Sequence, residues 1–143
     1  MRYYLSLGSN IGNREEHIDQ ACSLIEERCG NISARSSNYF SEPWGYKSDK
    51  TYLNICICIE SVLQPTELLD ATQQIERELG RTQKHVYADR TIVIDILTGT
   101  TDTGEDIRLS TDRLTIPHPL MEQRDFVMIP LSEIAAEEEM LNN

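Results

Sequence analysis

The chain has 143 residues, of which 39% are hydrophobic and 26% charged, and its formal net charge is −11. This length and composition predict one globular domain, residues 1–143, whose core needs no disulfide or metal to fold. The acidic charge argues against a broad nucleic-acid or anionic-membrane surface, because both require a basic stripe. Apolar runs are too short for a transmembrane helix, and the cysteine spacing fits buried, reduced thiols better than a zinc site. We therefore expect a cytoplasmic monomer that binds neither nucleic acid nor membrane.

Hydrophobic spacing predicts four strands and two main helices. The strands are expected at residues 3–7, 32–40, 53–60 and 92–97. The helices are expected at residues 14–29, after the cap Asn13, and from Pro65 to the stop at Gly80. A hairpin turn at residues 99–108, a short returning strand at 107–109 and a helical segment at 126–134 follow. The order is that of an α+β, ferredoxin-like βαββαβ sandwich, with two helices on one face of a mostly antiparallel sheet. The hairpin and the C-terminal helical segment are additions to it.

Two loops at strand ends are candidates for ligand contacts. Residues 8–13 join a strand to a helix but match neither GxGxxG nor the P-loop, so a turn with a helix cap is the simpler interpretation. Residues 41–54 place Trp44, Tyr46 and Tyr52 near Asn54. Aromatic rings beside an amide can bind a flat polar heterocycle by stacking and edge hydrogen bonds. The alternative is that these rings only cover the sheet.

The stretch between Arg77 and Arg124 carries about half of the 13 lysines and arginines of this acidic chain. A local cation cluster of this kind can hold a phosphate-bearing ligand inside a negative field. Phosphoryl transfer uses such cations to spread charge, and carboxylates to hold Mg²⁺ between phosphate oxygens. Asp95 interrupts an otherwise apolar strand, so its carboxylate should have a metal or arginine partner. The other candidates are Glu76, Arg81, Lys84, His85, Tyr87, Arg90, Arg113, His118 and Arg124.

Four short motifs make the chain resemble one enzyme family. They are GSN at Gly8, YLN at Tyr52, GR at Gly80, and IPHP followed by R.FV..PL between Leu114 and Leu131. With these motifs, the chain resembles the 6-hydroxymethyl-7,8-dihydropterin pyrophosphokinases of folate biosynthesis, over residues 3–135. The resemblance implies the ferredoxin-like fold and the transfer of pyrophosphate from MgATP to the hydroxymethyl group of a dihydropterin, with release of AMP. The implied partners are these two small molecules.

The resemblance also implies roles for individual residues. The pterin side comprises Ser41, Pro43, Trp44, Gly45, Tyr52, Asn54 and Phe126. Of these, Asn54 would read the edge of the pterin, while Tyr52 and Phe126 would flank its rings. The ATP side comprises Glu76, Lys84, Arg90, Ile96, Arg113, Thr115, His118 and Arg124. Arg81 and Arg90 would close over the phosphates, and His118 would donate to a phosphate oxygen. Asp95 would be the catalytic metal ligand.

One position departs from the pattern of the family. The family carries two metal-binding aspartates in R-x-x-D-x-D, whereas Val93 here occupies the first of them, between Arg90 and Asp95. Residues two apart in a strand share a face, so the face that should bridge two Mg²⁺ ions loses one carboxylate. The preceding loop is one residue shorter, with Tyr87 in place of the usual tryptophan. Asp89, Glu76 or a water molecule could substitute for the missing ligand.

Two hypotheses follow from the substitution at Val93. In the first, the chain is a working pyrophosphokinase that binds two Mg²⁺ ions at a weakened site. In the second, it is a catalytically impaired homologue that binds pterin or nucleotide. We favour the first, because the residues of the pterin side and the arginines are otherwise kept. A structural protein without this chemistry would leave the IPHP motif unexplained.

Overall fold

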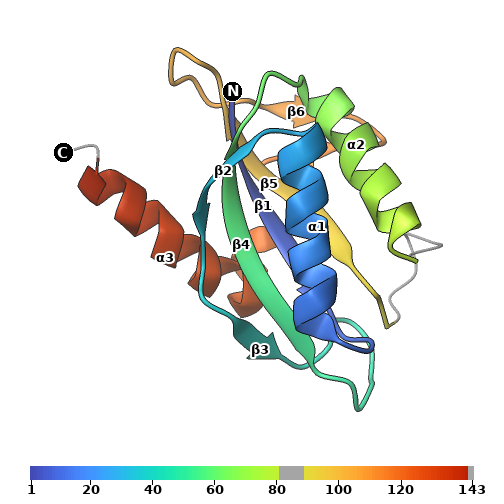
Figure 1. Ribbon diagram of the computed structural model, residues 1–143. Coiled ribbons are helices and arrows are strands. Elements are labelled where there is room, and N and C mark those ends of the chain that lie inside the picture. The colour runs from blue at the N-terminus through green and yellow to red at the C-terminus, as the bar shows by residue number, and fades with distance from the viewer. Residues whose placement is uncertain (81–88, 142–143) are drawn as a thin grey trace.

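The central sheet is antiparallel and has five strands (Figure 1). The computed structural model describes residues 1–80 and 89–141, with side chains through residue 136, so Arg81, Lys84, His85 and Tyr87 lie outside the described residues. The strands are β1 (Arg2–Ser9), β2 (Asn31–Arg35), β3 (Tyr39–Ser41), β4 (Tyr52–Glu60) and β5 (Val93–Thr100). They lie in the order β2-β4-β1-β5, and β3 also pairs with β4. With helices α1 (Arg14–Arg28) and α2 (Pro65–Glu78), this arrangement confirms the predicted βαββαβ order.

The predicted strand at residues 32–40 is divided into β2 and β3, which corrects the prediction. Ser36, between them, donates its backbone N–H to the Cys56 carbonyl at 2.9 Å. Its hydroxyl accepts the Cys56 N–H, also at 2.9 Å. A side-chain oxygen therefore replaces a backbone acceptor of the ladder, so the strand can be interrupted without leaving a buried N–H unpaired.

The segment after β5 also differs from the prediction. One bridge, Thr100 to Asp106, closes the predicted hairpin. The chain then forms β6 (Leu109–Ser110), which pairs with β7 (Thr115–Ile116) instead of returning along β5. The helical segment after it is longer than predicted and consists of the 3-10 helix η1 (Met121–Gln123) and α3 (Asp125–Leu141). Ile116 of β7 is the first residue of the IPHP motif. The pairing of β6 with β7 therefore places His118 beside β5, where its backbone N–H donates to the Leu97 carbonyl at 2.8 Å.

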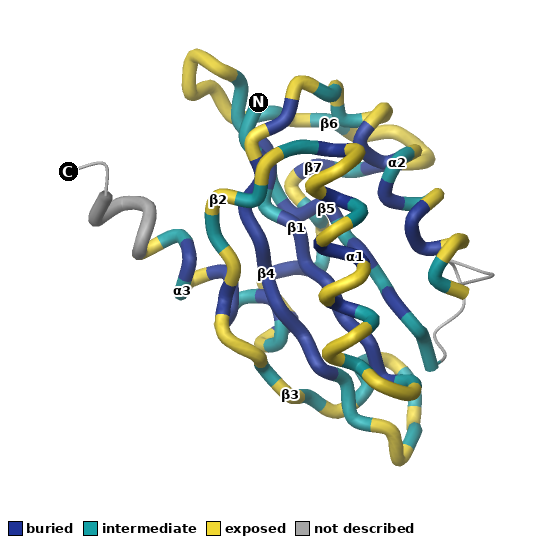
Figure 2. Tube along the Cα trace, viewed as in Figure 1, coloured by how far each residue is buried: buried dark blue, intermediate teal, exposed yellow. Residues whose placement is uncertain are grey.

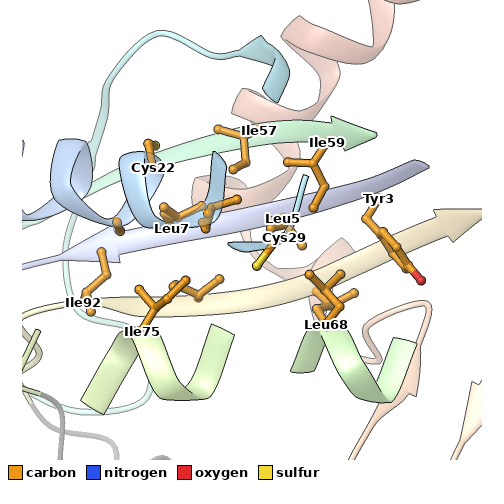
Figure 3. Close-up of a cluster of buried hydrophobic side chains, with 14 of the residues drawn as sticks. Tyr3, Leu5, Leu7, Cys22, Cys29, Ile57, Ile59, Leu68, Ile75 and Ile92 are labelled. Carbon is orange, nitrogen blue, oxygen red and sulfur yellow. The ribbon is translucent and has the colours of Figure 1, made fainter. Parts of the chain in front are cut away.

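The two faces of the sheet bury separate apolar clusters. Helices α1 and α2 lie side by side on one face, while α3 crosses the other and projects beyond the sheet (Figure 1). Figure 2 shows that β1 and β4 are buried along most of their length. The cluster under α1 and α2 includes Leu5, Leu7, Ile57, Ile59 and Leu68 (Figure 3). Because strand residues alternate between faces, Ser6 and Gly8 of β1 point to the α3 side instead.

The four cysteines lie on both sides of the sheet, and the alternation of side chains in β4 places two of them. Cys56 and Cys58 face α3, where they pack with Val127 and Leu131, while Cys22 and Cys29 lie in the cluster under α1 and α2. All four thiols are buried, as predicted, and the structure joins none of them in a disulfide. Burial raises the pKa of Cys56 to about 12, so this thiol stays protonated at neutral pH. No helix among residues 1–80 and 89–141 is long and apolar enough to cross a membrane.

Candidate active site

A pocket of about 310 Å³ opens on the sheet face opposite α1 and α2. Three paired residues lie side by side across its floor, because Gly8 of β1 pairs with Asn54 of β4 on one side and with Val93 of β5 on the other. A Cβ on Gly8 would lie 3.1 Å from Asn54 Oδ1 and 3.3 Å from Val93 Cγ1. The absence of a side chain at Gly8 therefore leaves a notch between the amide and the valine. In the next row of the floor, Ser6 pairs with Asp95.

Asn54 is held in one orientation at the floor of the pocket. Its side chain is 2% exposed, and its amide nitrogen donates to the Tyr39 carbonyl at 3.0 Å and to Ser41 Oγ at 2.8 Å. These two bonds use both amide hydrogens, so Oδ1 is the group turned toward Gly8. An acceptor oxygen fixed in this way can bind an N–H on the edge of a flat heterocycle.

Aromatic side chains form the wall above this floor. Trp44, Tyr46, Tyr52 and Phe126 line the pocket, together with Ser41 and Glu42. Pro43 and Gly45 lie outside the lining, although the resemblance placed them on the pterin side. Gly45 has a φ of 86°, a left-handed conformation that favours glycine. The turn at this glycine lets Trp44 and Tyr46, on either side of it, both face the pocket.

Three cationic or imidazole side chains enter the same pocket, namely Arg90, His118 and Arg124. The Arg124 guanidinium carbon lies 4.3 Å from the centre of the Trp44 ring and 5.8 Å from that of Phe126, within the range of cation–π attraction. Arg124 is 9% exposed, and its Nε has no hydrogen-bond acceptor in the part of the chain that the structure describes. His118 Nδ1 accepts the Leu120 N–H at 3.2 Å, so neutral His118 carries its proton on Nε2. An anionic ligand would supply the acceptor that the buried Arg124 Nε–H requires.

The remaining ATP-side residues with described positions lie at the outer edge of β5, away from the pocket. Glu76 of α2 is buried, and its Oε2 accepts the Ile94 N–H at 2.8 Å. Ile96 turns its side chain into the core under α1 and α2. Thr115 lies on β7, and Arg113 is exposed and forms an ion pair of 2.6 Å with Asp70. The structure therefore divides the residues assigned to ATP into an edge group and a pocket group.

A Mg²⁺ site in the pocket would depend on its carboxylates. Val93 and Asp95 both line the pocket, as expected for strand residues two apart. Among residues 1–80 and 89–136, no three histidine, cysteine or acidic side chains come close enough together to hold a metal. Asp89 is bound by Asn10 and Tyr46 outside the pocket lining, and Glu76 faces the edge of β5. One Mg²⁺ fits Asp95 together with phosphate oxygens, and Glu42, in the loop before β4, is the other acidic residue of the pocket lining.

Comparison with known proteins identifies the family. Residues 4–136 match the model of the family described as 7,8-dihydro-6-hydroxymethylpterin-pyrophosphokinase. The chain belongs to this family. It is 44% identical over 135 residues to the 2-amino-4-hydroxy-6-hydroxymethyldihydropteridine pyrophosphokinase of Porphyromonas gingivalis, covering 92% of this chain and 89% of that protein. The protein of the same name from Bacillus subtilis is 41% identical over 137 residues, covering 95% and 79%.

A solved structure supports the fold of this pyrophosphokinase family for the chain. It is a crystal structure of an HPPK-DHPS protein in complex with substrates, and it superposes with a TM-score of 0.68 at 14% identity. The match covers 93% of this chain and 40% of that one. At this low identity the match speaks for the fold alone, and it agrees with the ferredoxin-like sandwich predicted from the sequence.

Sequence reasoning missed several residues that line the pocket or support it. Ser6, Gly8, Glu42, Pro119 and Leu120 all line the pocket. A signal for Ser6 was present, because it is a polar residue between Leu5 and Leu7 in an otherwise apolar strand. The motif residues Pro119 and Leu120 were quoted for the resemblance but received no role. Gly8 and Asn10 belong to the GSN motif of the resemblance, which likewise assigned them no role.

Arg124→Met should weaken the binding of ATP by about 10- to 100-fold. A charge-assisted hydrogen bond contributes about 1.5–3 kcal/mol, and 1.4 kcal/mol corresponds to a factor of ten. Calorimetric titration measures the affinity, and the emission of Trp44, the only tryptophan of the chain, reports the loss of the stacked guanidinium. Arg108→Met is the matched control, because Arg108 is exposed and pairs at 3.9 Å with Asp106. Equal affinities of the two variants would contradict this role of Arg124.

Proposed function

We propose that this chain transfers pyrophosphate from ATP to the hydroxymethyl group of 6-hydroxymethyl-7,8-dihydropterin in folate biosynthesis. The hydroxyl oxygen forms a bond to the β-phosphorus of ATP, the bond from that phosphorus to the oxygen of the α-phosphate breaks, and AMP leaves. The products are AMP and the dihydropterin diphosphate, and the hydroxyl proton passes to solvent. The observation that carries this proposal is the convergence of an aromatic wall, a fixed amide and three phosphate-binding side chains in one pocket.

The pterin would lie on the floor of the pocket, against Asn54. Asn54 Oδ1 would accept an N–H from the pterin edge, since both amide hydrogens are already bound to Tyr39 and Ser41. Tyr52 and Phe126 would contact the faces of the ring, and Trp44 would close the wall beside Arg124. Pro43 and Gly45 would act through the shape of their loop.

ATP would extend from the edge of β5 into the pocket. Glu76, Arg113, Thr115 and the backbone of Ile96 would hold the nucleoside end, because they gather along that edge. Arg90, His118 and Arg124 would bind the phosphates, and the Nε2–H of His118 and the Nε–H of Arg124 are suitable donors. As the resemblance implies, Arg81 would close over the phosphates and Lys84 would belong to the ATP side, although both lie outside the described residues. Preorganised donors of this kind stabilise the charge that develops during transfer.

Asp95 is the residue that would hold Mg²⁺ in the pocket. When bound, Mg²⁺ neutralises phosphate charge, and it commonly binds through one or two carboxylates together with substrate phosphates. Asp95 and the phosphate oxygens are enough to ligate one Mg²⁺ ion. A second ion would have to depend on further substrate oxygens and water. We further propose that residues 1–143 form one domain and act in the cytoplasm as a monomer, because a single chain carries both the pocket and the edge group of residues.

AMP formation from ATP and hydroxymethyldihydropterin tests the proposed function. We expect the chain to release AMP only when both substrates are present, with a strong dependence on the Mg²⁺ concentration. Product can be followed by chromatography over a range of Mg²⁺ concentrations, and pterin binding by calorimetry. Retained pterin binding without AMP at any Mg²⁺ concentration would instead favour the catalytically impaired homologue.

A further inference from the structure

Asn10 connects the end of β1 to the residues that enter β5. It is 3% exposed, its Oδ1 accepts the Arg90 N–H at 2.7 Å, and its own N–H donates to the Arg90 carbonyl at 3.0 Å. Its side-chain amide nitrogen also donates to Asp89 Oδ1 at 2.8 Å and to the Lys50 carbonyl at 3.1 Å. One buried side chain therefore fixes three segments that are far apart in the sequence.

Asp89 continues this network toward the aromatic wall. Its Oδ1 lies 3.1 Å from the Tyr46 hydroxyl, which in turn lies 3.1 Å from the Tyr52 hydroxyl. A carboxylate can only accept, so Tyr46 donates to Asp89 and accepts from Tyr52. Lys50 Nζ stands 3.9 Å from the other carboxylate oxygen.

The charge of Asp89 suits this arrangement. Partial burial acts to raise the pKa of Asp89, but hydrogen bonds from Asn10, Ser48 and Tyr46 and the charge of Lys50 outweigh it and lower the pKa. Burial and the contact with Tyr52 raise the pKa of Tyr46, so its hydroxyl keeps the proton that it donates. Asp89 is therefore an ionised acceptor at neutral pH.

The network joins two parts of the pocket without entering it. Tyr46 and Tyr52 line the aromatic wall, and Arg90 lines the phosphate-binding part, whereas Asp89 and Asn10 lie outside the lining. Residues 42–51 form a loop between β3 and β4, and the bonds to Tyr46 and Lys50 tie this loop to the start of β5. A shift at Asp89 must therefore displace the aromatic wall and Arg90 together.

We infer that Asp89 is a positioning residue that, with Asn10, couples the heterocycle-binding wall to the phosphate-binding Arg90. The identity of the two ligands rests on the proposed function, but the coupling itself rests on the hydrogen bonds above. Binding of a nucleotide at Arg90 and binding of a pterin at the aromatic wall should therefore support each other through Asp89.

A double-mutant cycle tests the coupling. Asp89→Ala and Tyr46→Phe should each weaken dihydropterin binding about tenfold, and the double variant should bind no worse than the weaker single variant, because both changes break one chain of bonds. A non-hydrolysable ATP analogue should improve pterin affinity in the unaltered protein and much less in Asp89→Ala. Asp89→Asn keeps an acceptor oxygen and should restore part of the affinity. Calorimetry measures the affinity of each of these proteins, and thermal unfolding measures their stability.

Glu133→Ala provides the matched structural control. Glu133 of α3 also joins two segments, since its carboxylate accepts the Ser37 N–H at 3.0 Å and the Ser37 hydroxyl at 2.7 Å. We expect it to lower the melting temperature without changing pterin affinity or its dependence on nucleotide. Additive effects of Asp89→Ala and Tyr46→Phe, or equal losses of affinity in Asp89→Ala and Glu133→Ala, would overturn the inference.

A measurement without substrates separates this inference from the proposed function. The backbone amides of Asn10 and Arg90 are hydrogen-bonded across the network, so Asp89→Ala should speed their hydrogen exchange at least tenfold, while Glu133→Ala should not. If the unaltered protein bound no dihydropterin, the proposed function would fail and the exchange rates would still decide the coupling. Unchanged exchange at both amides in Asp89→Ala would refute it.

Discussion

Replacing Asp95 with alanine should abolish AMP formation. Asp95 lies on the pocket face of β5 opposite Ser6, and Val93 leaves it as the only acidic residue of that strand. Removing one preorganised electrostatic group from an active site typically costs about 10²–10³-fold in turnover. We expect a loss at the upper end of this range, because no neighbouring carboxylate on β5 can take over. Turnover at saturating substrates and Mg²⁺ measures the effect.

The reason for the loss can be separated from a loss of structure. Asp95→Asn keeps the size of the side chain and removes its charge, so it should be nearly as inactive as the alanine variant. Dihydropterin affinity should stay within about twofold in both variants, because Asn54 and the aromatic wall are unaltered. Asp106→Ala, at an exposed position of the hairpin, is the control for the loss of an acidic residue. Turnover of Asp95→Ala equal to that of the unaltered protein would refute Asp95 as the metal anchor.

The fold could be predicted from the sequence because its elements carry strong periodic signals. The run from Leu53 to Glu60 alternates cysteine and isoleucine, and it forms the buried strand β4 with separate faces, as expected. The break at Ser36 could not be predicted, because it depends on a hydroxyl that meets one particular N–H on a neighbouring strand. The short pair β6 and β7 likewise contains too few residues to show a period.

The candidate site could be predicted in part. Residues as distant as Ser41 and Phe126 line the same pocket, as the resemblance to a family motif indicated. Strand pairing places Ser41 beside Tyr52, and the packing of α3 on β3 and β4 brings Phe126 to the same face. The network of Asn10, Asp89 and Tyr46 was not predictable, because each residue lies in a different turn and only the tertiary fold brings them together. Polar residues in turns have local explanations, so their sequence gives no sign of a distant partner.

Val93→Asp should lower the Mg²⁺ concentration needed for half-maximal AMP formation, by about tenfold, or raise turnover. The valine faces the pocket two residues from Asp95, and it pairs with Gly8, which has no side chain to obstruct a carboxylate. An added opposite charge near a bound ion contributes roughly 1–4 kcal/mol at 4 Å in a partly solvated site. The lower limit corresponds to about a fivefold change in affinity, and a tenfold change needs only about 1.4 kcal/mol.

The same substitution should make stability depend on Mg²⁺, which gives a readout besides activity. Two carboxylates on one strand face repel each other when no cation is present, so Val93→Asp should melt at a lower temperature than the unaltered protein. Added Mg²⁺ should restore the difference, because an ion that binds the folded state stabilises it. Val62→Asp is the matched control, since Val62 is 92% exposed and follows Glu60, at the end of β4 away from Asn54. If Val93→Asp changed neither the Mg²⁺ dependence of turnover nor that of melting, the loss of the first aspartate would not limit this enzyme. Its pocket would then neutralise the phosphates chiefly through its cationic side chains and the Mg²⁺ held by Asp95, and Val93 would mark a site rebuilt around one acidic residue of β5.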